Sequence, residues 1–145
     1  MNKNHVRITR IFSFEAAHAL KDYTGPCRNI HGHSYKLWVT IKGAVDPATG
    51  FLMDFKELKR IINDTLIRLY DHHLMLCEDD GMVKKNISSV VENLVLLPFN
   101  PSSENLVISF SEMIFNALPK GIALHHLKLY ETEKSFTEWY AEDNQ

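Results

Sequence analysis

Two stretches of the chain alternate between apolar and polar positions, which is the period of half-buried β-strands. In the first, the apolar positions are even-numbered: Val6, Ile8, Phe12 and Phe14. In the second they are odd-numbered: Tyr35, Leu37, Val39 and Ile41. His18 continues the parity of the first apolar face, while His31 and His33 precede the second with its parity. The pattern therefore predicts two strands whose buried faces end in histidines.

Two other stretches have the three- and four-residue spacing of amphipathic helices. The first runs from Asp54 to near Asp71, with an apolar face at Phe55, Leu58, Ile62, Leu66 and Leu69. The second opens at Pro101-Ser102-Ser103-Glu104, where hydroxyl and acidic residues suit a helix N-terminus, and ends at Pro119 and Gly121. We expect two helices in the middle of the chain.

The segments outside these two strands and two helices complete the predicted order of elements. Residues 122–131 and 135–141 are close enough to form a hairpin of two further strands, whereas residues 77–100 are ambiguous and are assigned as irregular, with Leu94–Leu97 a possible edge strand. The order strand-strand-helix-helix-strand-strand predicts an α+β fold, with helices packed on one face of an antiparallel sheet. A chain of 145 residues suits a single domain, 1–145.

Composition narrows the classes of partner. Hydrophobic residues make up 45% of the chain, 16 basic residues stand against 18 acidic ones, and no long run of like charge occurs. These values argue against a nucleic-acid or membrane-surface partner. Because no signal-peptide pattern or bilayer-length apolar run is present, we expect a cytoplasmic protein. Cys27 and Cys77 could form a disulfide, although in a reducing compartment a thiol near histidines is more often catalytic or metal-linked.

The histidines carry the clearest chemical signal. In His31-Gly32-His33 the two imidazoles lie two residues apart, so an extended backbone directs both to one side. If the first two strands pair, His18 can converge on the same point. Three histidines leave one position open on a tetrahedral ion such as zinc, as in catalytic sites. The alternative is that these are ordinary core histidines.

Other candidates allow more than one interpretation. Cys27, four residues before His31, could be a reactive thiol or a fourth ligand that closes the metal site. Asp71 could orient the imidazole of His72 for proton transfer, or the pair could be a solvated helix end. Glu131 ends an apolar strand face, where its carboxylate either reaches solvent or binds a ligand.

Together these motifs resemble the 6-pyruvoyltetrahydropterin synthase family. In chain order they are Phe12-Ser13-Phe14-Glu15-Ala16-Ala17-His18, Cys27-x-x-x-His31-Gly32-His33-Ser34-Tyr35, Met53-Asp54-Phe55, Asp71-His72, Pro101-Ser102-Ser103-Glu104-Asn105 and Glu131-Thr132. The short gap between Cys27 and His31 looks more like the 6-carboxytetrahydropterin synthase branch, which serves queuosine synthesis, than like the animal enzymes.

The resemblance implies a tunnelling fold, with an antiparallel four-stranded sheet and two helices, in a homo-oligomer that is commonly a hexamer of two trimers. It implies a lyase that converts 7,8-dihydroneopterin triphosphate to 6-carboxy-5,6,7,8-tetrahydropterin with release of acetaldehyde and triphosphate. Alternatives are a 6-pyruvoyltetrahydropterin synthase, which only eliminates triphosphate, and a non-catalytic zinc-binding module.

The resemblance also implies residue roles. Zinc would be held by three ligands: His18, His31 and His33. Cys27 would move a proton with help from Asp71 and His72. Glu131 would anchor the pterin ring through a bidentate pair of hydrogen bonds.

Overall fold

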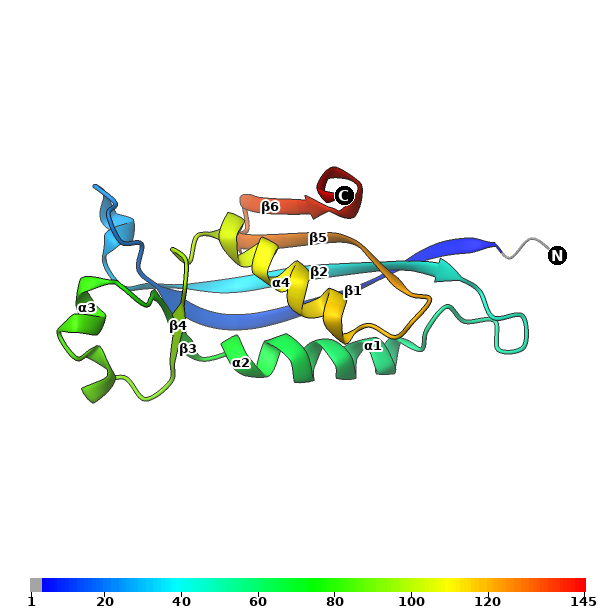
Figure 1. The fold of residues 1–145 in the computed structure, drawn as a ribbon, viewed down its shortest axis with the longest axis horizontal. Coiled ribbons are helices and arrows are strands. Elements are labelled where there is room, and N and C mark those ends of the chain that lie inside the picture. The colour runs from blue at the N-terminus through cyan, green and yellow to red at the C-terminus, as the bar shows by residue number, and fades with distance from the viewer. Residues whose placement is uncertain (1–3) are drawn as a thin grey trace.

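The structure, a computed structural model, describes residues 4–145 and has one mixed β-sheet with helices against it (Figure 1). Within these residues the sheet has six strands in the order β4-β3-β1-β2-β5-β6. Their bounds are β1 His5–His18, β2 His31–Ala44, β3 His73–Cys77, β4 Leu94–Leu97, β5 Ala123–Thr132 and β6 Ser135–Tyr140. The four longest, β1, β2, β5 and β6, pair antiparallel, whereas β3 is parallel to β1 and β4 is parallel to β3.

The predicted four-stranded antiparallel sheet is therefore wrong in extent, although its four strands are present. The two additional strands fall within or beside the segment assigned as irregular, and they extend the predicted element order between the two main helices. Leu74, Met75 and Leu76 of β3 are all buried, so this strand has no polar face and no alternation to reveal it. The possible edge strand at Leu94–Leu97 is confirmed as β4.

Both predicted helices are present. The first comprises α1, Phe55–Ile62, a π-helical turn, Asn63–Ile67, and α2, Arg68–Tyr70, so it ends next to Asp71 as expected. The second is α4, Ser103–Ala117, in which the Ser102 hydroxyl accepts a hydrogen bond from the backbone N–H of Asn105 at 3.2 Å. Shorter helical segments are α3 Gly81–Lys84 and the 3-10 turns Pro26–Arg28, Ile87–Ser89 and Ala141–Asn144.

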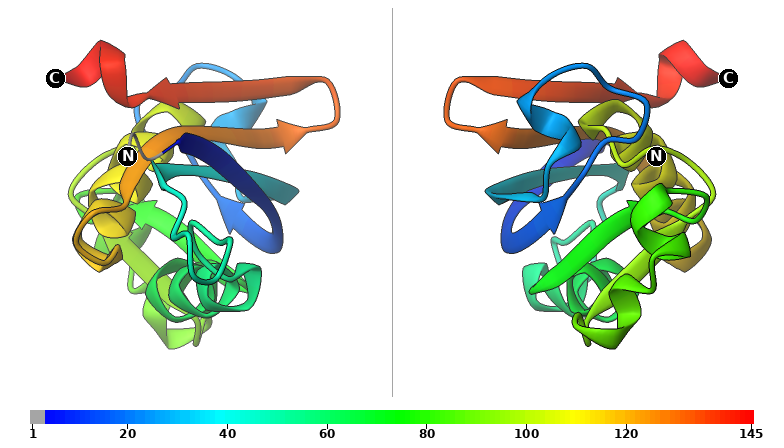
Figure 2. Two further views of the ribbon diagram at one scale, coloured as in Figure 1. Left: turned by 90° about the vertical axis from the view of Figure 1, so that its right-hand side faces the viewer. Right: turned by 90° about the vertical axis from the view of Figure 1, so that its left-hand side faces the viewer.

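The main core lies between one face of the sheet and the two long helical segments, which lie on the same side of the strands (Figure 2). Most strand residues with the predicted inward parity are buried there, although Val6 is exposed and Ile8 only partly buried. Phe14 stacks on Tyr35 with ring centroids 4.9 Å apart. From α4, Phe110 meets Phe14 edge-on at 6.2 Å. The opposite face of β1 and β2 carries exposed residues such as Glu15 and Ser34.

The parity of the strands thus fixes which side chains face the helices, and the histidines at the strand ends belong to that face. Within residues 4–145, no helix is both long and apolar enough to cross a membrane.

Candidate metal centre

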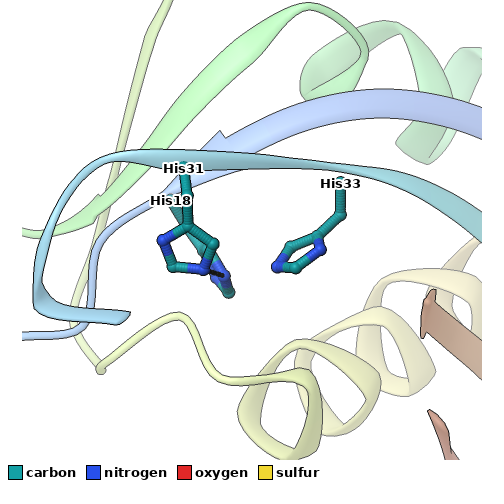
Figure 3. Close-up of side chains that lie close together, drawn as sticks. All are labelled: His18, His31 and His33. Atoms are coloured by element: carbon teal, nitrogen blue, oxygen red, sulfur yellow. Dashed lines mark hydrogen bonds between the residues drawn. The ribbon is translucent and has the colours of Figure 1, made fainter. Parts of the chain in front are cut away.

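Three histidines converge where the β1–β2 ladder ends, on the side of the sheet that faces α4 (Figure 3). In the antiparallel register His18 lies directly opposite His31, and His33 lies opposite Ala16. Since residues two apart in a strand share a face, all three imidazoles leave the sheet on one side. Their ligand nitrogens lie within 4.8 Å of one another. The predicted convergence is observed, and the cluster could hold a metal ion.

Backbone carbonyls orient two of these imidazoles. His18 donates from Nδ1 to the carbonyl oxygen of Pro101 at 2.7 Å, and His31 donates from Nδ1 to that of Asn29 at 2.8 Å. A carbonyl can only accept, so both rings keep the lone pair on Nε2. The two Nε2 atoms are 3.0 Å apart. Two facing lone pairs repel one another unless a proton or a cation lies between them, which is the arrangement expected of metal ligands with supporting hydrogen bonds.

His33 adds a second sign that the cluster suits a cation. Its Nε2 atom is buried and has no hydrogen-bond partner within the described chain. Glu131 Oε1 is 3.5 Å away, but the geometry is not that of a hydrogen bond. Buried polar atoms without partners are rare and need an explanation. A metal ion bound by the three histidines supplies one, so the donor set fits such an ion.

Burial lowers the pKa values of His18 and His33 below the usual histidine value. For His18 the hydrogen bond to Pro101 opposes this effect, and for His33 the negative charge of Glu131 does so. Burial therefore favours neutral imidazole, which is the metal-binding form. The same burial, with the charge of Glu131, raises the pKa of the neighbouring Tyr35 phenol.

Cys27 lies in the 3-10 turn between β1 and β2 and is a half-buried free thiol. Its carbonyl accepts a hydrogen bond from the N–H of Leu20 at 2.9 Å, which holds the turn close to the end of β1. Among residues 4–145 the cluster contains only the three histidines and not Cys27. Cys77 is buried and also free, and its thiol donates to Asp79 at 2.9 Å, so the two cysteines form no disulfide.

Asp71 and His72 form the predicted pair. Asp71 Oδ1 accepts from the N–H of Glu15 at 2.9 Å and lies 3.0 Å from His72 Nδ1. The Glu15 N–H, and then His72, lower the pKa of the Asp71 carboxyl. His72 has a left-handed backbone, with φ of 60°, and its N–H donates to the Glu15 carbonyl at 2.6 Å.

Neither Asp71 nor His72 belongs to the histidine cluster. With Glu15 and Ser34, His72 lines a cavity of about 670 Å³, and His33 lines the same cavity. The cavity therefore reaches the edge of the cluster. Within the described residues, no hydrogen bond or ion pair connects Cys27 to Asp71 or His72. The structure brings Glu131 to the cluster but leaves the proposed proton-transfer groups apart.

Sequence reasoning missed the groups that support the ligands. The carbonyls of Pro101 and Asn29 are backbone atoms, so no residue type identifies them, and Pro101 is 83 positions from His18. Asn105 and Asn100 could have been noticed, since Asn105 Nδ2 donates to the Asn100 carbonyl at 3.0 Å and holds the turn before α4.

The fold and the cluster define a class of protein with three converging histidines, able to hold a metal ion, on a mixed sheet. Comparison with known proteins identifies the family. Residues 7–142 match the family model described as 6-pyruvoyl tetrahydropterin synthase. The chain belongs to this family of pterin-processing lyases.

Individual relatives fall into two groups by name. The chain is 30% identical to the 6-carboxy-5,6,7,8-tetrahydropterin synthase of Rickettsia typhi over 136 residues, covering 92% of this chain and 99% of the relative. It is 29% identical to the 6-pyruvoyl tetrahydrobiopterin synthase of Poecilia reticulata over 147 residues, covering 93% and 90%. The solved 6-pyruvoyl tetrahydropterin synthase of Caenorhabditis elegans superposes with a TM-score of 0.73 at 26% identity, covering 97% and 99% of the two chains.

Proposed function

We propose that this chain is a zinc-dependent 6-carboxy-5,6,7,8-tetrahydropterin synthase that acts in queuosine and deazapurine synthesis. It would convert 7,8-dihydroneopterin triphosphate to the carboxylated pterin, with loss of triphosphate and of the distal side-chain carbons as acetaldehyde. The observation that carries the proposal is the open three-histidine cluster with the Glu131 carboxylate 3.5 Å from His33. This arrangement offers a site for a metal and, beside it, a carboxylate for the ring of a pterin.

His18, His31 and His33 would be the zinc ligands. The 3.0 Å separation of the first two Nε2 atoms is close to the roughly 3.3 Å expected when two nitrogens each lie about 2.0–2.1 Å from a tetrahedral zinc ion. Bound zinc would act as a Lewis acid that makes the side-chain hydroxyls of the substrate more acidic.

The other residues would bind the substrate and move protons. Glu131 would accept two hydrogen bonds from the ring nitrogen and exocyclic amine of the pterin. Cys27, in the turn beside the ligands, would exchange a proton with the substrate side chain. Asp71 would hold His72 in the tautomer that carries a proton on Nδ1 and leaves Nε2 free to accept one.

Because no hydrogen bond or ion pair joins Cys27 to Asp71 or His72 within residues 4–145, we infer that a second copy of the chain brings these groups together. We propose a cytoplasmic homo-oligomer, a hexamer of two trimers of the tunnelling type, in which the sheets of several copies close around a barrel. In such an assembly one subunit would supply Asp71 and His72 to the metal centre of another.

Product analysis tests the reaction. Purified zinc-loaded protein incubated with 7,8-dihydroneopterin triphosphate should release acetaldehyde and form the 6-carboxy product. A product that retains a pyruvoyl side chain would instead support a 6-pyruvoyltetrahydropterin synthase, a candidate favoured by the 29% identity to the Poecilia reticulata enzyme. Absence of any turnover would contradict both.

X-ray absorption at the zinc edge tests the non-catalytic alternative. We expect nitrogen and oxygen ligands only in the resting protein, because the histidine cluster does not include Cys27. A sulfur ligand would support a closed structural site and contradict the assigned role of the thiol.

A further inference from the structure

A second cavity, of about 650 Å³, lies at the end of the sheet next to the metal centre. Its walls are the β1–β2 connection, with Lys21, Asp22 and Arg28, and the α3 segment, with Lys85. These two segments project from the same end of the molecule (Figure 1), and the end-on view shows them on neighbouring sides of it (Figure 2). The cavity is open to solvent and is not used by any residue role assigned above.

The walls of this cavity carry basic side chains that form no ion pair within residues 4–145. Arg28 and Lys85 line it, and neither has an ion pair within residues 4–145. Lys21 is also basic, but its ammonium group is held by both carboxylate oxygens of Asp79, at 2.6 and 2.8 Å. Of the acidic residues on the walls, Asp80 accepts from the N–H of Met82 as a helix cap. This hydrogen bond leaves the charge of Asp80 in place, so Asp22 and Asp80 both oppose the free cations.

The cavity is connected to the metal centre by hydrogen bonds. Asn29 lines the cavity, and its carbonyl oxygen accepts from His31 Nδ1. On the same wall, the N–H of Lys21 donates to Asn100 Oδ1 at 3.0 Å, and Asn100 directly precedes Pro101, the acceptor for His18. The cavity thus adjoins the backbone groups that orient His18 and His31.

Glu131 lies on the other side of the cluster. Its carboxylate approaches His33, whereas the cavity adjoins the supports of His18 and His31. A ligand whose planar end contacts Glu131 and whose middle binds the metal would direct its far end toward Arg28 and Lys85. In a pterin triphosphate the ring and the triphosphate are at opposite ends of a short hydroxylated side chain, which is this order of groups.

We propose that the cavity between the β1–β2 connection and α3 binds the triphosphate group of the substrate, with Arg28 and Lys85 as its principal cationic contacts. The proposal rests on the proposed pterin triphosphate substrate. Arginine and lysine suit phosphate oxygens because both donate charge-assisted hydrogen bonds. Asp22 limits the affinity, which would help release of triphosphate after it is eliminated.

The direct test is binding of inorganic tripolyphosphate to the purified protein, measured by isothermal titration calorimetry at fixed ionic strength. We expect Arg28→Ala and Lys85→Ala each to raise the dissociation constant about fivefold, and the double variant more than about tenfold. Asp22→Asn should lower it about twofold, because a repulsive charge is removed. Lys84→Ala is the matched control, since Lys84 is exposed, adjacent in sequence and does not line the cavity.

Equal effects of Lys84→Ala and Lys85→Ala would overturn the proposal, because they would indicate a response to net charge alone. An unchanged dissociation constant in the double variant would also overturn it. This readout does not depend on turnover. If tripolyphosphate binding follows the pattern but dihydroneopterin triphosphate is not converted, the anion site stands and the proposed reaction fails. If conversion is normal and the binding pattern is absent, only the site fails.

Discussion

The end of the β1–β2 ladder and the junction before β3 both present histidines near carboxylates, but they differ in how they are held. At the ladder end, strand pairing sets His18 opposite His31, and backbone carbonyls orient both rings, that of the distant Pro101 for His18 and that of the nearby Asn29 for His31. At the junction, His72 has 73% of its side chain exposed, and within residues 4–145 its imidazole contacts the Asp71 carboxylate. The three histidines of the first region meet within one chain, whereas the second region presents its imidazole outward. This contrast agrees with the proposal above, in which the chain holds its own metal ion and supplies Asp71 and His72 to another copy.

The sharpest test of this contrast is His31→Ala. Removal of one of three ligands should abolish stoichiometric metal binding and reduce turnover by at least about 1000-fold, since Lewis-acid stabilisation is worth several kcal/mol. Metal analysis by mass spectrometry and turnover assays measure the two effects. His126→Ala is the matched control, because His126 lies outside the cluster and pairs with Glu138 on β6. Metal retention by the His31 variant would contradict the assigned ligand set.

Substitution at the junction should separate chemistry from metal binding. His72→Ala should reduce turnover by about 100-fold through loss of acid–base catalysis, with the metal content unchanged. Cys27→Ala should behave alike.

Mixed oligomers then test where these groups meet. When the inactive Cys27→Ala and His72→Ala chains are refolded together, we expect activity to return, because some sites would combine an intact thiol with an intact imidazole. The control is wild-type chain taken through the same refolding. If the control regains activity but the mixture of variants does not, the two groups act within one chain.

Glu131→Gln should weaken substrate binding and leave the metal content unchanged, which is a smaller effect than loss of a metal ligand. An amide cannot accept two hydrogen bonds from the pterin edge in the same way, so KM should rise about 10- to 100-fold. Steady-state kinetics and metal analysis distinguish this outcome from loss of the metal centre. An unchanged KM would remove Glu131 from the pterin site.

The smallest expected effect concerns the segment that supports His18. Ser102→Ala removes the N-cap of α4 and should lower the free energy of unfolding by about 1 kcal/mol, as measured by denaturant titration. Because Pro101 precedes this cap and accepts from His18, metal affinity should fall slightly as well. Ser88→Ala, at an exposed 3-10 turn, is a suitable control that should change neither quantity.

The sequence also predicted the end of the β1–β2 ladder better than the junction before β3. Strand parity correctly predicted that His18, His31 and His33 share a face, because the period of a strand is a local property. The same reasoning could not find β3, whose residues are buried without alternation and whose partner, β1, is more than fifty positions away. It identified Asp71 and His72 as a pair, but nothing local could show that they make no hydrogen bond or ion pair with Cys27 within residues 4–145.

The left-handed backbone of His72 has a consequence for the stability of the chain. A residue with a side chain is disfavoured in this conformation by about 1 kcal/mol, whereas glycine adopts it freely. Glycine at this position would therefore suit the bend between α2 and β3 better than histidine does. His72→Gly would remove this conformational cost, but it would also remove the 3.0 Å contact between the imidazole and Asp71. The backbone at this position therefore favours glycine, whereas the carboxylate beside it favours histidine.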